Sequence, residues 1–401
     1  MKYVVIQGDG MGDQPVESLG GKTPLEAAHT PNFDRVASHG LFGLVHTIPP
    51  GYPPGSDVGN LALFGYDPRK YYTGRSPLEA AAMGVALAPE DVSFRMNLVT
   101  VEGPEQGLIM DDYSAGHIDS AEAAQLVAAI AEQLSNATMS FYPGVSYRHL
   151  MVWKGGPLDM DTTPPHDITG KPIAGHLPKG PGADRLVKMM ETSRAILRDH
   201  PVNQKRLAQG KRPATQAWLW GQGKAPHMPT FQEIYGLSGA VISAVDLVRG
   251  VARYAGFENI AVPGITGYLD TNYRGKGEYA LRALDTHDLV FIHVEAPDEA
   301  GHMGNEAEKV KAIEAIDREV LGPLLEQLPK LGDFRVLITS DHATPVALRT
   351  HTPAAVPFAM ADHRQLAAAP GATWHYCEKD AAAARVEITE GYTIMDRLVK
   401  G

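Results

Sequence analysis

Residues 288–295 read DLVFIHVE and residues 335–340 read RVLITS, and both are short, nearly continuous apolar runs. Such runs are typical of strands that are buried on both faces of a parallel sheet. Residues 306–328, between them, carry apolar side chains at helical spacing and are predicted to be a helix. Strand, helix and strand in this order form a βαβ unit. A third such run, YVVIQ at residues 3–7, predicts that both ends of the chain join one α/β domain. Its sheet would be mostly parallel, with helices on both faces.

The middle of the chain has a different pattern. Residues 93–118 are predicted to form two strands around a turn, residues 120–134 a helix, and residues 142–153 the core of a second strand pair. Residues 154–184 are dense in Pro, Gly and His and show no periodicity. A stretch of that kind is typical of a domain boundary, a lid or a binding loop.

The simplest organisation is one α/β domain that carries a smaller, inserted α+β domain. We place the inserted domain at residues 96–174 and the α/β domain at residues 1–95 and 175–401. At roughly 100–200 residues per domain, a chain of 401 residues has room for two or three domains.

The composition is that of an ordinary globular protein, with 44% hydrophobic and 21% charged residues. These values exclude a collagen, a coiled coil and a largely disordered chain. The formal net charge is −11 and no basic run occurs, so we expect no binding to nucleic acid. An anionic small substrate is not excluded, because a pocket is governed by its local charges and bound metals.

The chain has a single cysteine, Cys377, so it cannot form an internal disulfide and has no cysteine-based zinc motif. The apolar run at the N-terminus is too short for a signal peptide or a membrane span. We therefore expect a cytoplasmic protein with no membrane association. The sequence predicts no particular oligomeric state.

Each of the three clearest strands ends in residue types that bind metals, and open α/β sheets bind ligands at the carboxyl ends of their strands. The candidate metal ligands are Asp9, Asp298, His302, Asp341, His342 and His351. A mixed set of carboxylates and imidazoles suits Mn²⁺ or Zn²⁺ better than Ca²⁺. Any one of these residues could be a helix cap or an ordinary loop residue, but such residues have no reason to gather at successive strand ends. The set therefore predicts a metal site.

The glycine-rich segment GDGMGD, residues 8–13, fits none of the common nucleotide or calcium motifs. Asp13 occupies the third glycine position of a dinucleotide fingerprint, and the segment lacks the acidic spacing of a calcium loop. No Walker sequence occurs in the chain, so no nucleotide cofactor is expected. We interpret the segment as a flexible turn that lets Asp9 face a metal.

Ser56 is the candidate nucleophile, because it follows a Pro/Gly loop at the predicted start of a helix. Free amides and the positive end of the helix dipole stabilise phosphoryl oxygens at such a position. A serine there is more commonly an N-cap, and the local sequence alone favours the cap. No Gly-x-Ser-x-Gly elbow is present, so an esterase triad is not supported. Without a His base, the hydroxyl would need a metal for activation.

These motifs together resemble those of the archaeal-type cofactor-independent (2,3-bisphosphoglycerate-independent) phosphoglycerate mutases, which belong to the alkaline phosphatase superfamily. The motifs that carry the resemblance are GDGMGD (8–13), PGSD (54–57), EAPDEAGH (295–302), SDH (340–342) and THT (350–352). Further similar blocks extend it over nearly the whole chain: SAGHI (114–118), GVSYRHL (144–150), TPPHDITGK (163–171), WLWGQGK (218–224) and GYLDTNY (267–273).

The resemblance implies an alkaline-phosphatase-like fold with a site for two divalent ions. One ion would be held by Asp298, His302 and His351. The other would be held by Asp9, Asp341, His342 and the oxygen of Ser56. Mn²⁺ is the expected metal, with Zn²⁺, Mg²⁺ and Co²⁺ as alternatives, and neither a nucleotide nor 2,3-bisphosphoglycerate is expected as a cofactor. Asp57, beside the nucleophile, departs from the longer bacterial and plant mutases.

A phosphoglycerate carries a phosphate and a carboxylate, so guanidinium or ammonium groups are expected to converge on it. Candidates for this role are Arg75, Arg95, Arg148 and Lys276, with His117, His149 and His166 as polar partners. Each of them could instead belong to an ordinary surface ion pair.

The resemblance implies an isomerase that interconverts 3-phosphoglycerate and 2-phosphoglycerate in glycolysis and gluconeogenesis. Ser56 would become phosphoserine, and the glycerate would reorient before its other hydroxyl takes the phosphoryl group back. The inserted domain would close over the site, because access of water would make the enzyme a phosphatase. A phosphotransferase acting on homoserine in threonine biosynthesis and a metal-dependent phosphatase are the alternative enzymes. A non-enzymatic metal-binding protein would leave Ser56 unexplained.

Overall fold

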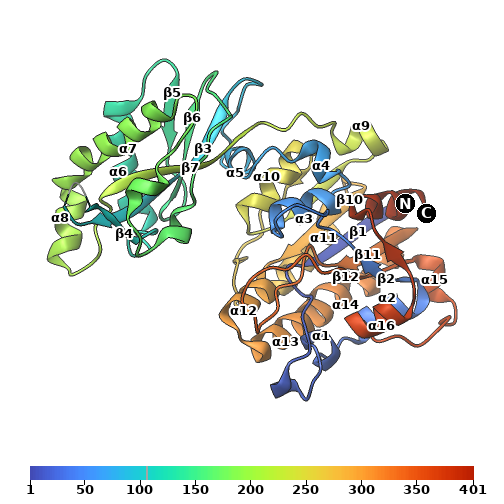
Figure 1. Ribbon diagram of the computed structural model, residues 1–401. Helices are drawn as coiled ribbons and strands as arrows, with labels where there is room; N and C mark the ends of the chain where they lie inside the picture. The colour runs from blue at the N-terminus through green and yellow to red at the C-terminus, as the bar shows by residue number, and fades with distance from the viewer. Residues whose placement is uncertain (105–106) are drawn as a thin grey trace. The chain divides into compact units, whose positions relative to one another are not determined.

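The structure is a computed structural model, which describes residues 1–104 and 107–401 (Figure 1). The chain divides into two compact units. The first comprises Met1–Tyr72 and Met228–Gly401, and the second comprises Thr73–His227. Helices and strands alternate in the first unit, which is the α/β domain that the sequence predicts.

An eight-stranded sheet forms the centre of the first unit. In spatial order its strands are β13 (Glu387–Ile388), β2 (Leu41–Val45), β12 (Val356–Asp362), β11 (Phe334–Thr339), β1 (Lys2–Gly8), β10 (Leu289–Val294), β8 (Gly239–Ile242) and β9 (Glu258–Asn259). Only β12 runs antiparallel to its neighbours, β11 and β2. The sheet is therefore mostly parallel, as predicted.

The three strands predicted from apolar runs lie side by side, with β1 between β10 and β11. Gln7 of β1 is level with His293 of β10 on one side and with Thr339 of β11 on the other. Because all three strands are parallel, they end at the same edge of the sheet. Residues that follow each strand are thus brought together there.

Helices pack on both faces of this sheet. On one face, Val4 and Ile6 belong to a buried cluster with side chains of α2, α11 and α13. On the opposite face, Phe291 of β10 stacks on Phe64, which ends α3. The helices of the first unit are α1 (Pro24–Ala27), α2 (Pro31–His39), α3 (Ser56–Leu63), α4 (Pro68–Tyr71), α9 (Phe231–Tyr235), α10 (Asp246–Tyr254), α11 (Tyr273–Ala283), α12 (Ala296–Met303), α13 (Glu306–Ala315), α14 (Gly322–Gln327), α15 (His363–Ala367), α16 (Glu378–Ala383) and α17 (Ile394–Lys400).

The helix predicted over residues 306–328 is interrupted by a π-helical segment, Ile316–Leu321, between α13 and α14. Within it, Asp317 is almost fully buried and accepts hydrogen bonds from the backbone N–H of Phe33 (2.7 Å) and from Asn32 Nδ2 (2.9 Å). Both donors lie in the first turn of α2, whose N-cap residue Thr30 makes no side-chain cap. Asp317 therefore satisfies one free backbone amide, that of Phe33, at the start of a neighbouring helix.

The second unit is an α+β fold around a five-stranded sheet. Its strands are β3 (Val92–Glu102), β4 (Ile109–Asp112), β5 (Met139–Tyr142), β6 (Arg148–Trp153) and β7 (Gln216–Lys224), and its helices are α5 (Ser76–Ala82), α6 (Ser120–Leu134), α7 (Ala183–Arg198) and α8 (Pro201–Ala208). The two predicted strand pairs are the antiparallel pairs β3–β4 and β5–β6, and α6 has the predicted bounds. The predicted turn between β3 and β4 includes residues 105–106, which lie outside the described residues.

The predicted boundaries of the inserted domain, 96–174, are too narrow at both ends, since the second unit extends over Thr73–His227. At the carboxyl-terminal end the reason is the pairing of β7 with β3 along most of its length, which ties residues 216–224 to this unit. At the amino-terminal end the hydroxyl of Ser76 in α5 donates to the carbonyl oxygen of Ser93 in β3, which ties α5 to the same unit. Apolar periodicity identifies a strand but not the sheet that it joins. Residues 154–184 therefore lie inside the second unit and are not a boundary.

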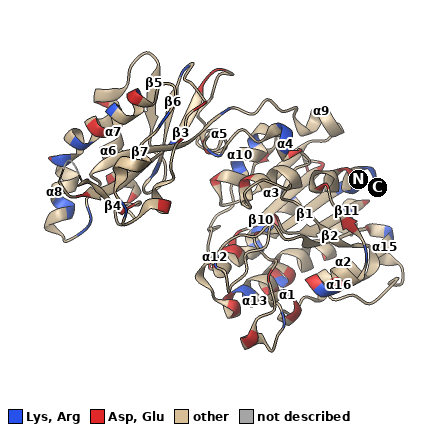
Figure 2. Ribbon diagram, viewed as in Figure 1, with Lys and Arg blue, Asp and Glu red and all other residues tan. Residues whose placement is uncertain are grey.

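Among the described residues, no helix combines the length and the apolar character needed to cross a membrane. Acidic and basic residues are interspersed along the chain in both units (Figure 2).

Candidate metal centre and nucleophile

The six predicted metal ligands lie beyond the carboxyl ends of β1, β10 and β11. Asp9 follows β1 directly, and Asp341 and His342 follow β11 after one residue. After β10 the chain enters α12, where Asp298 and His302 are one turn apart and hence share a face of the helix. His351 lies in the loop between β11 and β12. The structure thus brings together all six candidates.

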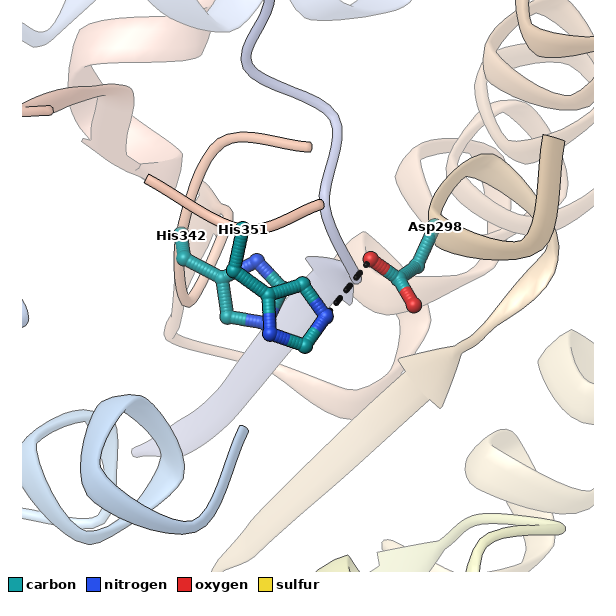
Figure 3. Close-up of side chains that lie close together, drawn as sticks. All are labelled: Asp298, His342 and His351. Carbon is teal, nitrogen blue, oxygen red and sulfur yellow. Dashed lines mark ion pairs between the residues drawn. The ribbon is translucent and has the colours of Figure 1, made fainter. Parts of the chain in front are cut away.

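Asp298, His302 and His351 form the first part of this cluster. His302 Nε2 lies 2.9 Å from His351 Nε2 and 3.2 Å from Asp298 Oδ2. His351 Nε2 is 3.6 Å from Asp298 Oδ1, which is the ion pair drawn in Figure 3. Asp298 is 4% exposed, so its carboxylate is held in the interior.

Asp9, Asp341, His342 and Ser56 form the second part. His342 Nε2 lies 3.3 Å from Asp341 Oδ2 and 3.5 Å from Asp9 Oδ1, and all three side chains are fully buried. Ser56 Oγ is 3.2 Å from the same nitrogen. The two parts are continuous, because the rings of His342 and His351 are 4.1 Å apart between centroids and both lie near Asp298.

The tautomers of His302 and His351 follow from their outer hydrogen bonds. His302 Nδ1 is 3.0 Å from the carbonyl oxygen of Arg349, and His351 Nδ1 is 3.4 Å from that of Pro54. A carbonyl oxygen can only accept, so in both neutral rings Nδ1 carries the proton and Nε2 presents a lone pair. The two Nε2 atoms therefore face each other and Asp298, an arrangement that needs a cation there: a metal ion or, without one, a proton on His302 Nε2 that donates to Asp298 Oδ2 at 3.2 Å.

His342 has the same orientation. Its Nδ1 is 3.2 Å from Thr344 Oγ1, and that hydroxyl donates its own proton to Asp298 Oδ1 at 2.5 Å. The hydroxyl oxygen must then accept from His342 Nδ1–H, which leaves His342 Nε2 bare beside Asp9 and Ser56. An outer partner that fixes the tautomer in this way is typical of metal-binding histidines.

The carboxylates differ in their electrostatic environment. Burial, together with the charges of Asp341, Glu295 and Asp298, holds the pKa of Asp9 well above its usual range. Burial also acts to raise the pKa of Asp298, but hydrogen bonds with His302 and His351 outweigh it and the pKa lies well below its ordinary value. The hydrogen bond with Asp298 raises the pKa of His302 to about 9.

The donor set fits divalent metal ions. Buried carboxylates repel one another unless cations lie among them, and three imidazole lone pairs point at the same region. Asp9 Oδ1 is buried and has no hydrogen-bond partner. Nitrogen and oxygen donors in this mixture suit Mn²⁺ and Zn²⁺.

The glycine-rich turn at residues 8–13 is held by a lysine that sequence analysis did not single out. Lys309 is fully buried, and its Nζ donates to the carbonyl oxygens of Gly12 (3.1 Å) and Thr344 (2.8 Å) and to Asp13 Oδ2 (2.8 Å). It thereby links the loop after β1 to the loop after β11. A Cβ at Gly10, where φ is +58°, would lie 2.5 Å from Asp298 Oδ1, so the turn needs glycine there.

Ser56 is the first residue of α3, and Gly55 is the N-cap. The N-cap interpretation that the local sequence favours is therefore wrong, and the Ser56 hydroxyl contacts His342 instead. The neighbouring Asp57 accepts from its own helix at Val58 N–H (3.0 Å) and from the hydroxyl of Tyr72 (2.6 Å). Asp57 is thus engaged in local hydrogen bonds.

Six of the seven predicted substrate-binding residues lie in the second unit, and all of these but the buried His149 belong to one group of charged and aromatic side chains. Arg75 and Arg95 each pair with Glu79, at 3.2 and 3.0 Å, and the guanidinium of Arg95 lies 4.1 Å from the ring centroid of Trp220. Arg148 also helps to lower the pKa of Glu79, although burial opposes the shift. We call this set the guanidinium cluster; its members are Arg75, Arg95, Arg148, Glu79 and Trp220.

Aromatic and histidine rings adjoin the guanidinium cluster. His166 is 5.4 Å from Trp220 between ring centroids and 6.1 Å from Tyr113, which in turn is 6.4 Å from His117. His117 and Tyr147 are 5.9 Å apart, and Arg148 lies over the Tyr147 ring.

The other two predicted substrate contacts, Lys276 and His149, are buried side chains. Lys276 is fully buried in the first unit, where its Nζ donates to the carbonyl oxygen of His293 (2.7 Å), and burial lowers its pKa to about 8. His149 is 3% exposed and accepts from the backbone N–H of Gly144, and burial lowers its pKa to about 3. Both side chains are interior groups, which the residue type alone did not reveal.

Comparison with known proteins identifies the family to which this chain is similar. The family described as 2,3-bisphosphoglycerate-independent phosphoglycerate mutase matches residues 37–203. Relatives from Geobacter sulfurreducens and Methanosarcina acetivorans are 53% and 49% identical, each over the full length of both chains, and the second is named 2,3-bisphosphoglycerate-independent phosphoglycerate mutase. The chain belongs to this phosphoglycerate mutase family.

A solved structure agrees with that membership. The cofactor-independent phosphoglycerate mutase of Thermoplasma acidophilum is 29% identical, with a TM-score of 0.69 and coverage of 100% of this chain and 99% of that chain. The family described as type I phosphodiesterase / nucleotide pyrophosphatase also matches, over residues 180–364. That stretch includes Asp298, Asp341 and His351, and the first match includes Ser56, so the two family matches together cover the candidate nucleophile and most of the candidate metal ligands.

Proposed function

We propose that this chain is a metal-dependent phosphoglycerate mutase that interconverts 3-phosphoglycerate and 2-phosphoglycerate. The observation that carries the proposal is the position of Ser56, whose Oγ lies at the amino end of α3 and 3.2 Å from His342 Nε2. Full-length relatives with this activity in their names support it. The direct test is conversion of 3-phosphoglycerate by the purified chain, measured by coupling 2-phosphoglycerate to enolase.

Two divalent ions are proposed at the cluster of Asp and His side chains. Asp298, His302 and His351 would hold one, and Asp9, Asp341, His342 and Ser56 would hold the other. Mn²⁺ is the proposed metal, because the donor set mixes carboxylates with imidazoles. When bound, such ions supply electrostatic stabilisation of the charge on the phosphoryl group.

Ser56 and α3 account for the covalent step. Ser56 Oγ loses its proton and attacks the phosphorus of 3-phosphoglycerate, the bond from phosphorus to the substrate oxygen breaks, and that oxygen takes up a proton as phosphoserine and glycerate form. The amino end of α3 presents backbone N–H groups and a positive dipole to the phosphoryl oxygens. Glycerate then presents its other hydroxyl, which attacks phosphoserine and regenerates Ser56 as 2-phosphoglycerate forms.

The second unit is proposed to bind the substrate through the guanidinium cluster and to exclude water from the phosphoserine. Replacing Arg148 with Met should raise KM for 3-phosphoglycerate by about 10- to 100-fold with a smaller change in kcat, because a charge-assisted hydrogen bond contributes roughly 1.5–3 kcal/mol. Steady-state kinetics check this.

Arg185→Met is the matched control for Arg148→Met. Arg185 lies 5.6 Å from the Trp153 ring, and Arg148 lies at the same distance from the Tyr147 ring, so both variants lose one cation–π contact in the same unit. Arg185 is outside the guanidinium cluster, and its replacement should leave KM unchanged. Equal kinetics in the two variants would remove Arg148 from the substrate site.

Return of the phosphoryl group to the molecule that lost it distinguishes a mutase from a phosphatase. With 3-phosphoglycerate and excess isotopically labelled glycerate, we expect 2-phosphoglycerate with little label and little inorganic phosphate, because the glycerate stays bound while Ser56 is phosphorylated. Mass spectrometry of the products measures both. Phosphate release at the rate of substrate loss would instead identify a phosphatase.

The homoserine phosphotransferase alternative is not favoured, since the relatives that match over the full length carry the mutase name. The proposed partner is a small phosphorylated substrate. Because that substrate belongs to central carbon metabolism, we propose a cytoplasmic location.

A further inference from the structure

His293 is a fourth histidine at the metal centre, and its hydrogen bonds differ from those of His302, His342 and His351. It is the fifth residue of β10 and is fully buried. Its Nε2 lies 2.8 Å from Asp9 Oδ2, and its Nδ1 lies 2.9 Å from Ser243 Oγ. Its outer partner is thus a hydroxyl that can donate, and its nearest inner partner is the carboxylate of Asp9, with Glu295 Oε2 farther away at 3.3 Å.

Ser243 sets the tautomer of His293. The Ser243 oxygen already accepts from the backbone N–H of Val245 at 3.0 Å, while the carbonyl oxygen of Val245 is a distant acceptor at 3.4 Å. The best use of the hydroxyl proton is therefore donation to His293 Nδ1. A neutral ring that accepts at Nδ1 carries its proton on Nε2, so His293 Nε2–H donates to Asp9.

The surroundings fix the His293 ring in place. Lys276 Nζ donates to the backbone carbonyl of His293, and Glu295 Oε2 lies 3.3 Å from His293 Nε2. Gln7 is level with His293 on the neighbouring strand β1, two residues before Asp9. The donor and the carboxylate that accepts from it are thus carried by two paired strands, which limits their relative movement.

We propose that His293 is a positioning residue for Asp9, with Ser243 fixing the required tautomer. By donating to Oδ2, His293 orients the carboxylate so that Oδ1 faces His342 Nε2, 3.5 Å away. This inference rests on the proposed metal binding by Asp9. It assigns His293 no contact with substrate and no ligand role: its effect is on the affinity of the site that Asp9, Asp341 and His342 form.

The expected magnitude follows from other metal centres, where loss of such an outer hydrogen bond weakens metal binding by about 10- to 100-fold. His293→Leu removes the donor and should weaken one of two Mn²⁺ sites by that factor. His293→Gln retains an N–H donor at a similar reach and should recover most of the affinity. Ser243→Ala removes the tautomer control and should give an intermediate loss.

The measurement is isothermal titration of the full, metal-stripped chain with Mn²⁺, with circular dichroism as the check on folding. His375→Leu is the matched control, because His375 Nδ1 also pairs with a carboxylate in the first unit, Asp34 Oδ1 at 2.9 Å, away from the predicted ligands. Its Mn²⁺ affinity should equal that of the wild type. If His293→Leu fails to fold, the comparison of His293→Gln with Ser243→Ala decides, since Ser243→Ala should bind more weakly.

Four results would overturn the inference. Unchanged Mn²⁺ affinity in His293→Leu, or an equal loss of affinity in His293→Leu and His293→Gln, would show that His293 contributes only to packing. Equal affinity in Ser243→Ala and His293→Gln would remove the tautomer control. Complete loss of one of the two Mn²⁺ equivalents in His293→Leu, equal to that in Asp9→Asn, would make it a ligand. Asp9→Asn separates this inference from the proposed function: if it loses one equivalent while His293→Leu binds normally, only the inference fails, and if the wild type binds no Mn²⁺, the proposed metal centre fails.

Discussion

Ser56→Ala is expected to lower turnover of 3-phosphoglycerate by about 10⁴- to 10⁶-fold, the range seen when a catalytic nucleophile is deleted. Its hydroxyl is the nucleophile of the proposed reaction, at the amino end of α3 and 3.2 Å from His342 Nε2. Ser56 is not the N-cap of α3, so its removal should leave the helix intact. Enolase-coupled kinetics measure the loss, and circular dichroism checks the fold.

A covalent product provides the second readout for Ser56. Mass spectrometry of wild-type protein quenched during turnover should find phosphate on the peptide that contains Ser56, and none in the variant. Ser120→Ala is the control, because Ser120 is likewise the first residue of a helix, α6, but lies in the second unit. Retained activity in Ser56→Ala would replace phosphoserine with direct transfer or attack by water.

The metal centre could be predicted from the sequence because it depends on strand order alone. Three apolar runs mark β1, β10 and β11, and parallel strands that lie side by side place whatever follows them at one edge. Asp9, Asp298 and Asp341 each follow one of these strands. Their convergence therefore needed no knowledge of loop conformation.

The supporting residues could not be predicted, because their roles depend on contacts distant in sequence. Lys309 occupies a position on the apolar stripe of α13, and only the fold shows that its Nζ meets the carbonyl oxygens of Gly12 and Thr344. Lys276 looked like an anion-binding residue, yet it is buried against β10. The single His in the apolar run DLVFIHVE, His293, was a signal that could have been followed.

The predicted boundaries of the inserted domain differ from those of the second unit for a related reason. Strand β7 has the same apolar character as the strands of the first unit, but its backbone pairs with β3 from Val92 to Val99. Pairing partners are set by tertiary contacts, so residues 216–224, which the prediction placed in the α/β domain with the rest of 175–401, belong to the second unit. The function assigned to each unit does not depend on this boundary, since every predicted metal ligand lies in the first unit.

Removal of divalent ions is expected to abolish mutase activity, and Mn²⁺ is expected to restore it. Without the ions, repulsion would act among the buried carboxylates of Asp9, Asp298 and Asp341 and the three imidazole lone pairs. Metal removal should therefore lower the free energy of unfolding as well as the rate of reaction. At a free-ion concentration of about 100 times Kd, each site should stabilise the folded state by about 2.7 kcal/mol. Activity and calorimetry before and after chelation measure the two effects.

The variants Asp298→Asn and His302→Ala test whether these two residues bind one of the ions. Each should lose about one metal equivalent while the fold survives, because the two proposed sites use separate ligands. In hydrogen exchange, chelation should deprotect residues 9–13 and 341–351, which carry ligands or flank them, and should leave strand β3 of the second unit unchanged. Full activity in the metal-stripped chain would refute a two-metal mechanism.

Retention of two metal equivalents in both variants would show that Asp298 and His302 are not ligands. Deprotection spread evenly over both units would mean that the ions stabilise the chain without binding at a defined site. The buried cluster of carboxylates and imidazole nitrogens argues against that outcome.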